Sequence, residues 1–177
     1  MTAAMADPVS RAAAGRRLYL LFRIGEDRYA LDAADVSEVL GLRVLKQVPG
    51  APDWVAGMLD RRGAAVPVID MSALAGRGAA AAVTSTRLAL VRYRAGPHAQ
   101  DRPLGLILEQ ATETAHFDPA AFQPSGLDNP GARYLGPVLS DGRGMVQAVT
   151  VDALLPAPVR ALLFPADSEG AGHEARP

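Results

Sequence analysis

Short stretches in which apolar and polar residues alternate run through most of the chain, and this two-residue period is typical of half-buried β-strands. Strands are predicted on this basis at residues 18–24, 28–31, 54–59, 64–69, 87–94, 103–110, 132–139 and 145–149. Three pairs of these strands flank short loops rich in glycine and acidic residues, at residues 25–27, 60–63 and 140–144. Such loops favour tight turns, so the pattern predicts three β-hairpins.

Only short helices are predicted between the strands. Asp32 is a suitable N-cap, and Gly41 is a suitable stop. Between them Val36, Val39 and Leu40 share one face at helical spacing, which predicts a helix of about two turns. Further short helices are predicted near residues 70–74, 119–122 and 151–155.

The second half of the chain repeats the pattern of the first. Gly57 and Gly136 are each followed by an apolar strand, a turn, a second strand and a short helix. A duplicated set of short strands favours two small closed barrels, because closure removes the exposed strand edges. A single irregular sandwich is the alternative. Alternation along the strands points six side chains inward: Leu59, Val66 and Val68 in the first barrel, and Leu106, Leu108 and Val146 in the second.

Composition suggests where the domain begins and ends. Residues 76–85 are small and without period, so they are expected to form a flexible connector. The expected organisation is a disordered segment at 1–16, a domain at 17–156 with barrels near 17–75 and 86–156, and an extension at 157–177 that is largely disordered after residue 165. The chain ends are allowed to cross over between the barrels.

Charge and composition argue against several classes of partner. The formal net charge is −1, so no electrostatic excess favours nucleic acid or an anionic membrane. No window is apolar enough to span a bilayer, and the N-terminal residues lack the apolar stretch of a signal peptide. The chain has no cysteine, which excludes disulfides and thiolate chemistry. We therefore expect a cytoplasmic protein that neither binds nucleic acid nor inserts into a membrane.

The residues that catalysis requires are sparse. His98, His116 and His173 do not have ligand spacing, and no serine lies in a nucleophile elbow. Five aspartates fall in predicted turns, where they accept backbone hydrogen bonds: Asp27, Asp60, Asp101, Asp128 and Asp141. The sequence therefore predicts a protein that is not an enzyme and that uses neither a cofactor nor a metal.

One segment has a specific resemblance. The run G-M-L-D-R-R-G-A-A-V-P-V-I-D-M, from Gly57 to Met71, resembles the signature of CheW-like chemotaxis coupling proteins. Upstream, residues 19–40 resemble the opening hairpin of that family and its V-x-E-V segment. Downstream, residues 104–109 and 134–149 resemble later strands. Arg61 stands where the family usually has an apolar residue.

This resemblance implies a fold and a role. The fold would be two SH3-like five-stranded β-barrels with a groove between them for the tip of a chemoreceptor coiled coil. One face of the first barrel would bind the regulatory domain of a CheA-type histidine kinase, in an array at the inner membrane. The candidate receptor-binding residues are Glu38, Gly57, Arg62 and Val36, and the candidate kinase-binding residues are Leu42 and Val44. Glu38 is expected to be exposed, whereas Val36 and Val39 are expected to face the core.

Two other functions fit parts of the pattern. A CheW-like adaptor of a non-flagellar pathway, serving pili, surface sensing or cyclic-nucleotide output, would have the same motifs. A small barrel that binds nucleic acid is a more remote alternative, and it would need a basic stripe with exposed aromatic residues. Arginines suited to such a stripe are Arg16, Arg17, Arg23, Arg28 and Arg43. Acidic residues interspersed among them argue against it.

Overall fold

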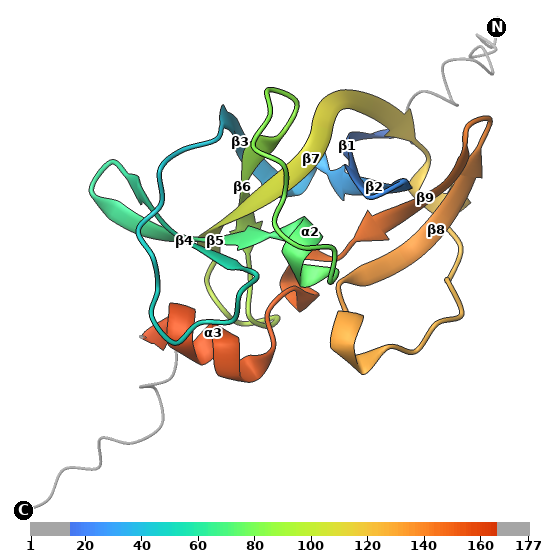
Figure 1. Cartoon of the computed structure of the whole chain (residues 1–177). Helices are drawn as coiled ribbons and strands as arrows, with labels where there is room; N and C mark the ends of the chain where they lie inside the picture. The colour runs from blue at the N-terminus through green and yellow to red at the C-terminus, as the bar shows by residue number, and fades with distance from the viewer. Residues whose placement is uncertain (1–14, 166–177) are drawn as a thin grey trace, which may run out of the picture.

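The computed structural model describes residues 15–165, which form a predominantly β fold with short helical segments (Figure 1). The strands are β1 (Arg17–Ile24), β2 (Asp27–Asp32), β3 (Val36–Gly41), β4 (Val55–Arg61), β5 (Ala64–Asp70), β6 (Arg87–Tyr93), β7 (Arg102–Phe117), β8 (Leu135–Asp141) and β9 (Gly144–Val149). The helical segments are the 3-10 turns η1 (Ala33–Asp35), η2 (Pro119–Ala121), η3 (Pro130–Ala132) and η4 (Val151–Ala153) and the α-helices α2 (Met71–Leu74) and α3 (Ala157–Leu163). The predicted all-β class with a few short helices is confirmed.

The strands form two five-stranded, barrel-like sheets that share β7. The central barrel consists of β3, β6, the first part of β7, β5 and β4. The terminal barrel consists of the second part of β7, β1, β2, β9 and β8. β7 pairs with β6 through residues 102–108 and with β1 through residues 109–117, and Figure 1 shows this long strand crossing from one group to the other.

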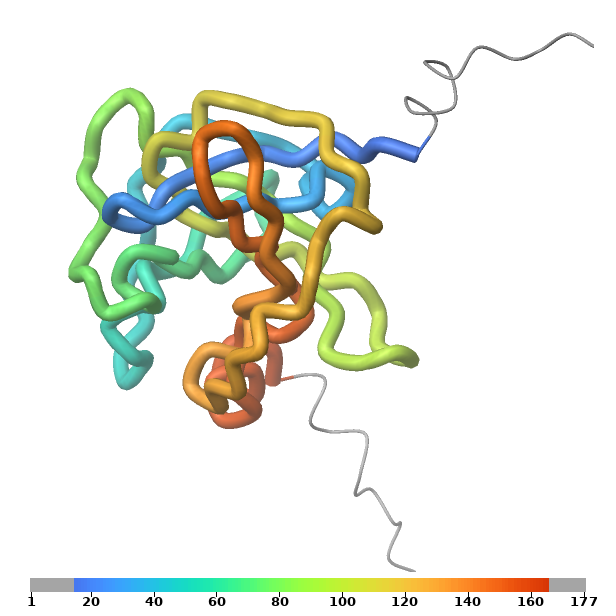
Figure 2. The backbone as a smooth tube through the Cα atoms, turned by 90° about the vertical axis from the view of Figure 1, so that its right-hand side faces the viewer, coloured from blue at the N-terminus to red at the C-terminus, as the bar shows by residue number. Residues whose placement is uncertain are grey.

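Strand pairing crosses the boundary expected at residues 76–85. The β1–β2 hairpin, expected in the first barrel with β4 and β5, pairs instead with β7 on one side and with β9 on the other. β2 and β9 run parallel, with Arg28 opposite Val146 and Ala30 opposite Ala148. Figure 2 shows these N-terminal and C-terminal hairpins together, in blue and orange. Each barrel is thus assembled from strands on both sides of the boundary.

Several strands bury both of their faces. On β1, Leu20 and Phe22 belong to a large apolar cluster between the barrels, called here the shared core, whereas Tyr19 and Leu21 point into the terminal barrel. β6 alternates in the same way between the shared core and the central barrel. Because neighbouring side chains on a strand point to opposite faces, continuous apolar runs are the expected consequence.

All six residues predicted to point inward are buried. Leu59, Val66 and Val68 lie inside the central barrel, and Val146 lies inside the terminal barrel. The remaining two are Leu106 and Leu108, which lie in the shared core between the barrels. The predicted apolar interface between two barrels is therefore present, and β7 supplies part of it.

The predicted helix after Asp32 is wrong. Asp32 is indeed an N-cap, because its carboxylate accepts a hydrogen bond from the Ala34 amide at 2.9 Å. The helical part ends after the single 3-10 turn η1, and the residues from Val36 onward form β3, which pairs with β6. The helical spacing of Val36 and Val39 was misleading because strand pairing outweighs a weak local preference, and β-branched residues suit a strand.

The loop at residues 76–85, expected to be a flexible connector, is held by hydrogen bonds. Asp70 accepts from the Ala80 amide at 2.8 Å, and Glu109 accepts from the Ala81 amide at 2.5 Å. The Thr86 hydroxyl donates to the Ala81 carbonyl at 2.6 Å. Two carboxylates, one at the end of β5 and one within β7, therefore fix a loop whose own side chains show no pattern.

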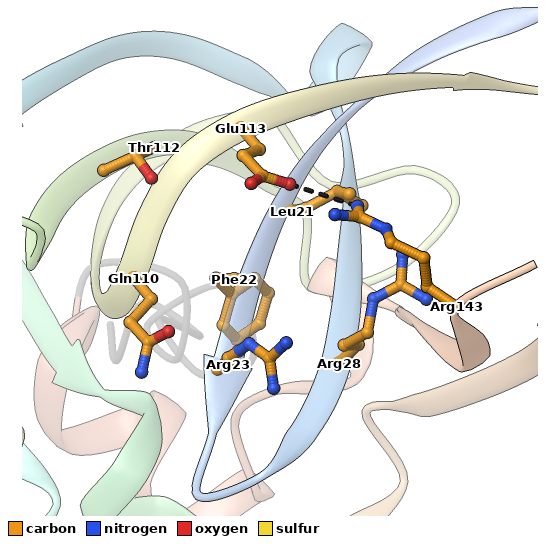
Figure 3. Close-up of a pocket in the computed structure, with 8 residues that line it drawn as sticks. All are labelled: Leu21, Phe22, Arg23, Arg28, Gln110, Thr112, Glu113 and Arg143. Carbon is orange, nitrogen blue, oxygen red and sulfur yellow. Dashed lines mark hydrogen bonds and ion pairs between the residues drawn. The ribbon is translucent and has the colours of Figure 1, made fainter.

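β7 bends where it passes from one sheet to the other. Leu21 pairs with Glu113 and Arg23 with Glu109, so residues 110–112 form a bulge without partners on β1. Gln110 has a φ of 48°, a left-handed conformation that is rare for residues other than glycine. A polar pocket of about 150 Å³ lies beside this bulge. Arg143 and Glu113, which both line it, form an ion pair of 3.1 Å, drawn as a dashed line in Figure 3.

A bidentate ion pair ties β2 to the β8–β9 turn. The Arg28 guanidinium donates to both Asp141 oxygens, at 2.8 and 2.9 Å. The Arg28 side chain is 10% exposed and the Asp141 side chain 25% exposed. This hydrogen-bonded guanidinium lowers the pKa of Asp141 from 3.8 to about 2. The carboxylate therefore stabilises the fold when it is ionised.

We predict that Asp141→Asn destabilises the protein in a pH-dependent way. The pKa of Asp141 is depressed in the folded state, so its stabilising contribution is present above pH 4 and is lost as the pH falls towards 2. The shift corresponds to at most about 2 kcal/mol. Urea unfolding between pH 7 and pH 2 should show the wild type and Asp141→Asn converging at the acidic end. Asp128→Asn, on an exposed loop, is the matched control. If the difference in unfolding free energy between the wild type and Asp141→Asn stayed constant from pH 7 to pH 2, the assignment would be contradicted.

Candidate protein-binding faces

An ion pair closes one side of the central barrel. Among residues 15–165, no backbone ladder joins β3 to β4. Instead Arg61, at the end of β4, pairs with Glu38 on β3. Their side chains are 29% and 36% exposed, so the pair is partly shielded from water. The structure thus brings Glu38 together with Arg61, and Arg61 was noticed in the sequence only as a departure from the family pattern.

Arg62 occupies the tip of the β4–β5 hairpin. The two-residue loop Arg62-Gly63 has φ values of 55° and 81°, which is the pattern of a type I′ turn. Asp60 accepts from the Gly63 amide at 2.9 Å, and Asp70 caps α2, so neither carboxylate is paired with Arg62. Arg62 is exposed, and its guanidinium has no hydrogen bond or ion pair within residues 15–165. It is therefore available to a partner.

Gly57 has a structural role in the path of the chain. Its φ is 145°, and a Cβ at this position would lie 2.6 Å from the Lys46 carbonyl oxygen and 2.9 Å from the Leu45 Cβ. This close approach allows Lys46 and Met58 to exchange backbone hydrogen bonds of 2.9 and 2.7 Å. Gly57 thus permits a close approach of two backbone segments. Its role in receptor binding stays a prediction.

The apolar candidates differ in their exposure. Val36 is half-buried and packs against the shared core, as expected, whereas Val39 is 45% exposed and does not face the core. Val39 was placed by a helical period that β3 does not follow. In the loop after β3, Leu42 is half-buried and Val44 is 97% exposed. Val44 thus presents an apolar side chain to solvent next to a partly buried leucine.

Asp60 and Asp141, two of the aspartates predicted in turns, accept backbone hydrogen bonds, whereas Asp101 pairs with the Arg94 guanidinium at 2.6 Å instead. Asp60 accepts from Gly63, and Asp141 accepts from the Arg143 amide at 2.8 Å. Within residues 15–165 no group of three or more His, Cys, Asp or Glu side chains is arranged to hold a metal ion. His173 lies outside the described residues.

Several arginines considered for a nucleic-acid stripe are engaged within the fold. Arg17 pairs with Asp32 at 3.4 Å, Arg28 pairs with Asp141, and Arg23 donates to the Glu26 carbonyl at 3.0 Å. The acids interspersed along these strands therefore neutralise the positive charge locally. In the described part of the chain, no helix is both long enough and apolar enough to cross a membrane.

Comparison with known proteins shows which family has this arrangement of strands. Residues 18–159 match the CheW-like domain. The chain belongs to the CheW-like family. It is 26% identical to the chemotaxis protein CheW of Rhizobium meliloti over 82% of this chain and 92% of that protein. Over a shorter stretch, 40% of this chain and 44% of its relative, it is 31% identical to the protein FrzA of Myxococcus xanthus.

A solved structure has the same fold. The scaffolding protein TtCheW from Thermoanaerobacter tengcongensis superposes with a TM-score of 0.70, over 90% of this chain and 96% of that one, at 20% sequence identity. The suspected family is confirmed, and so is the fold class that it implies. The CheW-like domain therefore carries the hairpin of Arg62 and the loop of Val44 on one barrel.

We predict that Gly57→Ala destabilises the CheW-like domain by about 2 kcal/mol, because the new Cβ collides with backbone and the φ is one that side chains rarely adopt. Thermal unfolding should show a Tm lower by roughly 4–8 °C. Gly142→Ala is the control, since a Cβ there meets nothing within 4 Å and its φ is not positive. If the two variants had the same Tm, the loop after β3 would be able to move away from the new Cβ without loss of stability.

We predict that Arg62→Asn stabilises the domain by about 0.5–1 kcal/mol, because asparagine tolerates the left-handed conformation better than arginine and Asn-Gly favours a type I′ turn. Urea unfolding measures the change, with Arg16→Asn as an exposed control. If Arg62→Asn unfolds at lower urea than the wild type, the guanidinium contributes to the hairpin and is not reserved for a partner.

Proposed function

We propose that this chain is a non-enzymatic adaptor that couples chemoreceptors to a CheA-type histidine kinase in a bacterial chemosensory array. The observation that carries the proposal is the match of residues 18–159 to the CheW-like domain. The relatives named chemotaxis protein CheW and the structure named a scaffolding protein support it. The adaptor acts in the cytoplasm, against the receptor arrays at the inner membrane.

In this proposal the receptor tip binds the side of the central barrel formed by β3 and the β4–β5 hairpin, where the candidate residues lie, rather than the groove between the barrels that the resemblance implied. Arg62 offers an exposed planar guanidinium that can hold a receptor carboxylate in a bidentate manner. Glu38 is partly exposed beside it, with its charge compensated by Arg61. Gly57 and Val36 support this surface indirectly. Gly57 sets the path of the backbone, and Val36 fixes β3 by packing against the shared core.

The kinase regulatory domain binds the loop after β3. Val44 is almost fully exposed, and Leu42 lies partly buried two residues earlier. A small apolar anchor of this kind carries much of the affinity of an interface when its partner covers it. The same loop is fixed by the Lys46–Met58 bridge, so its apolar side chains are presented on a rigid support.

The adaptor transmits signals without chemistry. Contacts with two partners bias a kinase by holding it in the conformation that suits those contacts, which is a population shift. Such a role requires rigid partner faces and no reactive groups. Both barrels supply short, well-paired strands with buried side chains, and the turn acids serve the backbone.

We predict that Arg62→Glu abolishes receptor binding while kinase binding and folding are retained. Arg62→Asn removes the guanidinium but favours the turn. Loss of receptor binding in this variant would therefore come from the missing charge and not from lower stability. A pull-down with the organism's own chemoreceptors and kinase measures both interactions, and Arg16→Glu is the exposed control. If Arg62→Glu melts several degrees lower and loses both partners together, Arg62 is structural and the receptor face lies elsewhere.

We predict that Val44→Asp weakens kinase binding at least tenfold, which is about 1.4 kcal/mol, because it places a charge in an apolar contact. Val83→Asp is the matched control, since Val83 is also an exposed valine, 54% exposed, on a different loop. Calorimetric titration with the kinase regulatory domain measures the difference. Unchanged affinity in a folded Val44→Asp variant would move the kinase face away from this loop.

A further inference from the structure

We infer that residues 157–164 form a strap, which holds the two barrels in one relative position and forms a removable wall of a groove lined by Leu74, Tyr134 and Leu155. The strap consists of α3 and Phe164. This role concerns the arrangement of the barrels within one chain, so it goes beyond the binding of receptor and kinase and does not depend on it.

The strap starts on one barrel and ends on the other. It follows β9 of the terminal barrel through η4 and the next two residues, Leu154 and Leu155, which are buried in the shared core. At the far end, Phe164 stacks on Tyr93 of β6 in the central barrel, with ring centroids 5.7 Å apart and planes 10° apart. The Arg102 guanidinium lies over the same ring, 5.9 Å from its centroid. An aromatic and cationic anchor thus fixes the end of the strap.

The anchor supplies most of what orders α3. The helix has seven residues, and its N-cap, Pro156, makes no side-chain capping hydrogen bond. A helix this short is not stable by itself, because nucleation costs more than a few hydrogen bonds return. Of its residues only Leu163 is buried, while Leu162 is 45% exposed. Val159 also packs against the shared core but is only partly buried, so the order of the strap depends mainly on Leu163 and Phe164, at its last turn.

The strap forms one side of a groove of about 540 Å³. Its lining comes from three places. Leu155 precedes the strap and Arg160 belongs to α3, Arg133 and Tyr134 follow η3, and Leu74 belongs to α2. Figure 1 shows α3 at the lower edge of the molecule, away from the tip of the β4–β5 hairpin. Detachment of α3 removes a wall of this groove and uncovers the part of the shared core around Tyr93.

A second contact limits the segment of the chain that can detach. The Asp152 carboxylate, in η4, accepts from the Arg94 backbone amide at 3.0 Å, which links the segment before the strap to the residue that follows β6. The match to the CheW-like domain ends at residue 159, before the anchor residues Leu163 and Phe164. The link at Asp152 keeps η4 in place, so release is confined to residues 157–164.

Hydrogen exchange measured by mass spectrometry tests the strap. In Phe164→Ala, amide exchange at residues 157–164 should rise at least tenfold over the wild type, while the β4–β5 and β8–β9 hairpins stay within twofold. Leu162→Ala is the matched control on the exposed side of the same helix. Unchanged protection of residues 157–164 would overturn the proposal. Uniformly faster exchange in all strands would also overturn it, because Phe164 would then be an ordinary core residue.

A distance measurement tests whether the strap sets the barrel positions. The chain has no cysteine, so spin labels on Val39→Cys and Met145→Cys report one exposed strand position on each barrel. Pulsed electron resonance should give a broader distance distribution with Phe164→Ala than with Leu162→Ala, and Phe164→Leu should restore most of the narrow distribution. An unchanged distribution in Phe164→Ala would show that the barrels keep their position without the strap.

Discussion

Strands β1, β6 and β7 carry apolar side chains on both faces, and burial of both faces at once is the constraint on which the rest of the structure depends. A single sheet cannot cover two faces of the same strand, so the chain must build a barrel on one side and a second barrel on the other. Leu106 and Leu108, both fully buried, lie at the centre of this arrangement. Removal of such a leucine costs about 2–5 kcal/mol, a large part of the stability of a domain.

The side of the central barrel that carries the candidate binding residues is held by a different kind of interaction. Where backbone pairing between β3 and β4 is missing in the described residues, the Arg61–Glu38 ion pair and the Lys46–Met58 bridge close the gap. These contacts place an exposed cation and an exposed valine on rigid supports. A protein that works through contacts alone needs this combination of fixed backbone and unsatisfied surface groups. The barrel interior provides the fixed backbone, and the loops provide the unsatisfied surface groups.

Much of the fold followed from local sequence, and the failures have physical causes. The hairpin around Arg62 was predicted because turn chemistry and period-2 alternation are local, and the inward position of Val66 follows from the same alternation. The strand at Val36 was missed because its helical spacing is also local, whereas its pairing with β6 is not. Arg61 was not chosen as a site residue, since only the fold brings it to Glu38. The ordered loop at 76–85 was missed because the groups that hold it, Asp70 and Glu109, lie outside it.

The continuity of β7 through both sheets has a consequence for dissecting the molecule. A cut in the loop at residues 76–85 would leave β1 and β2 without β7 and β9, and would leave β6 without β3. Neither fragment would contain a complete barrel, although the sequence repeat suggests two equal modules. The two barrels are therefore interlocked in chain order, and the smallest autonomous folding unit is the pair.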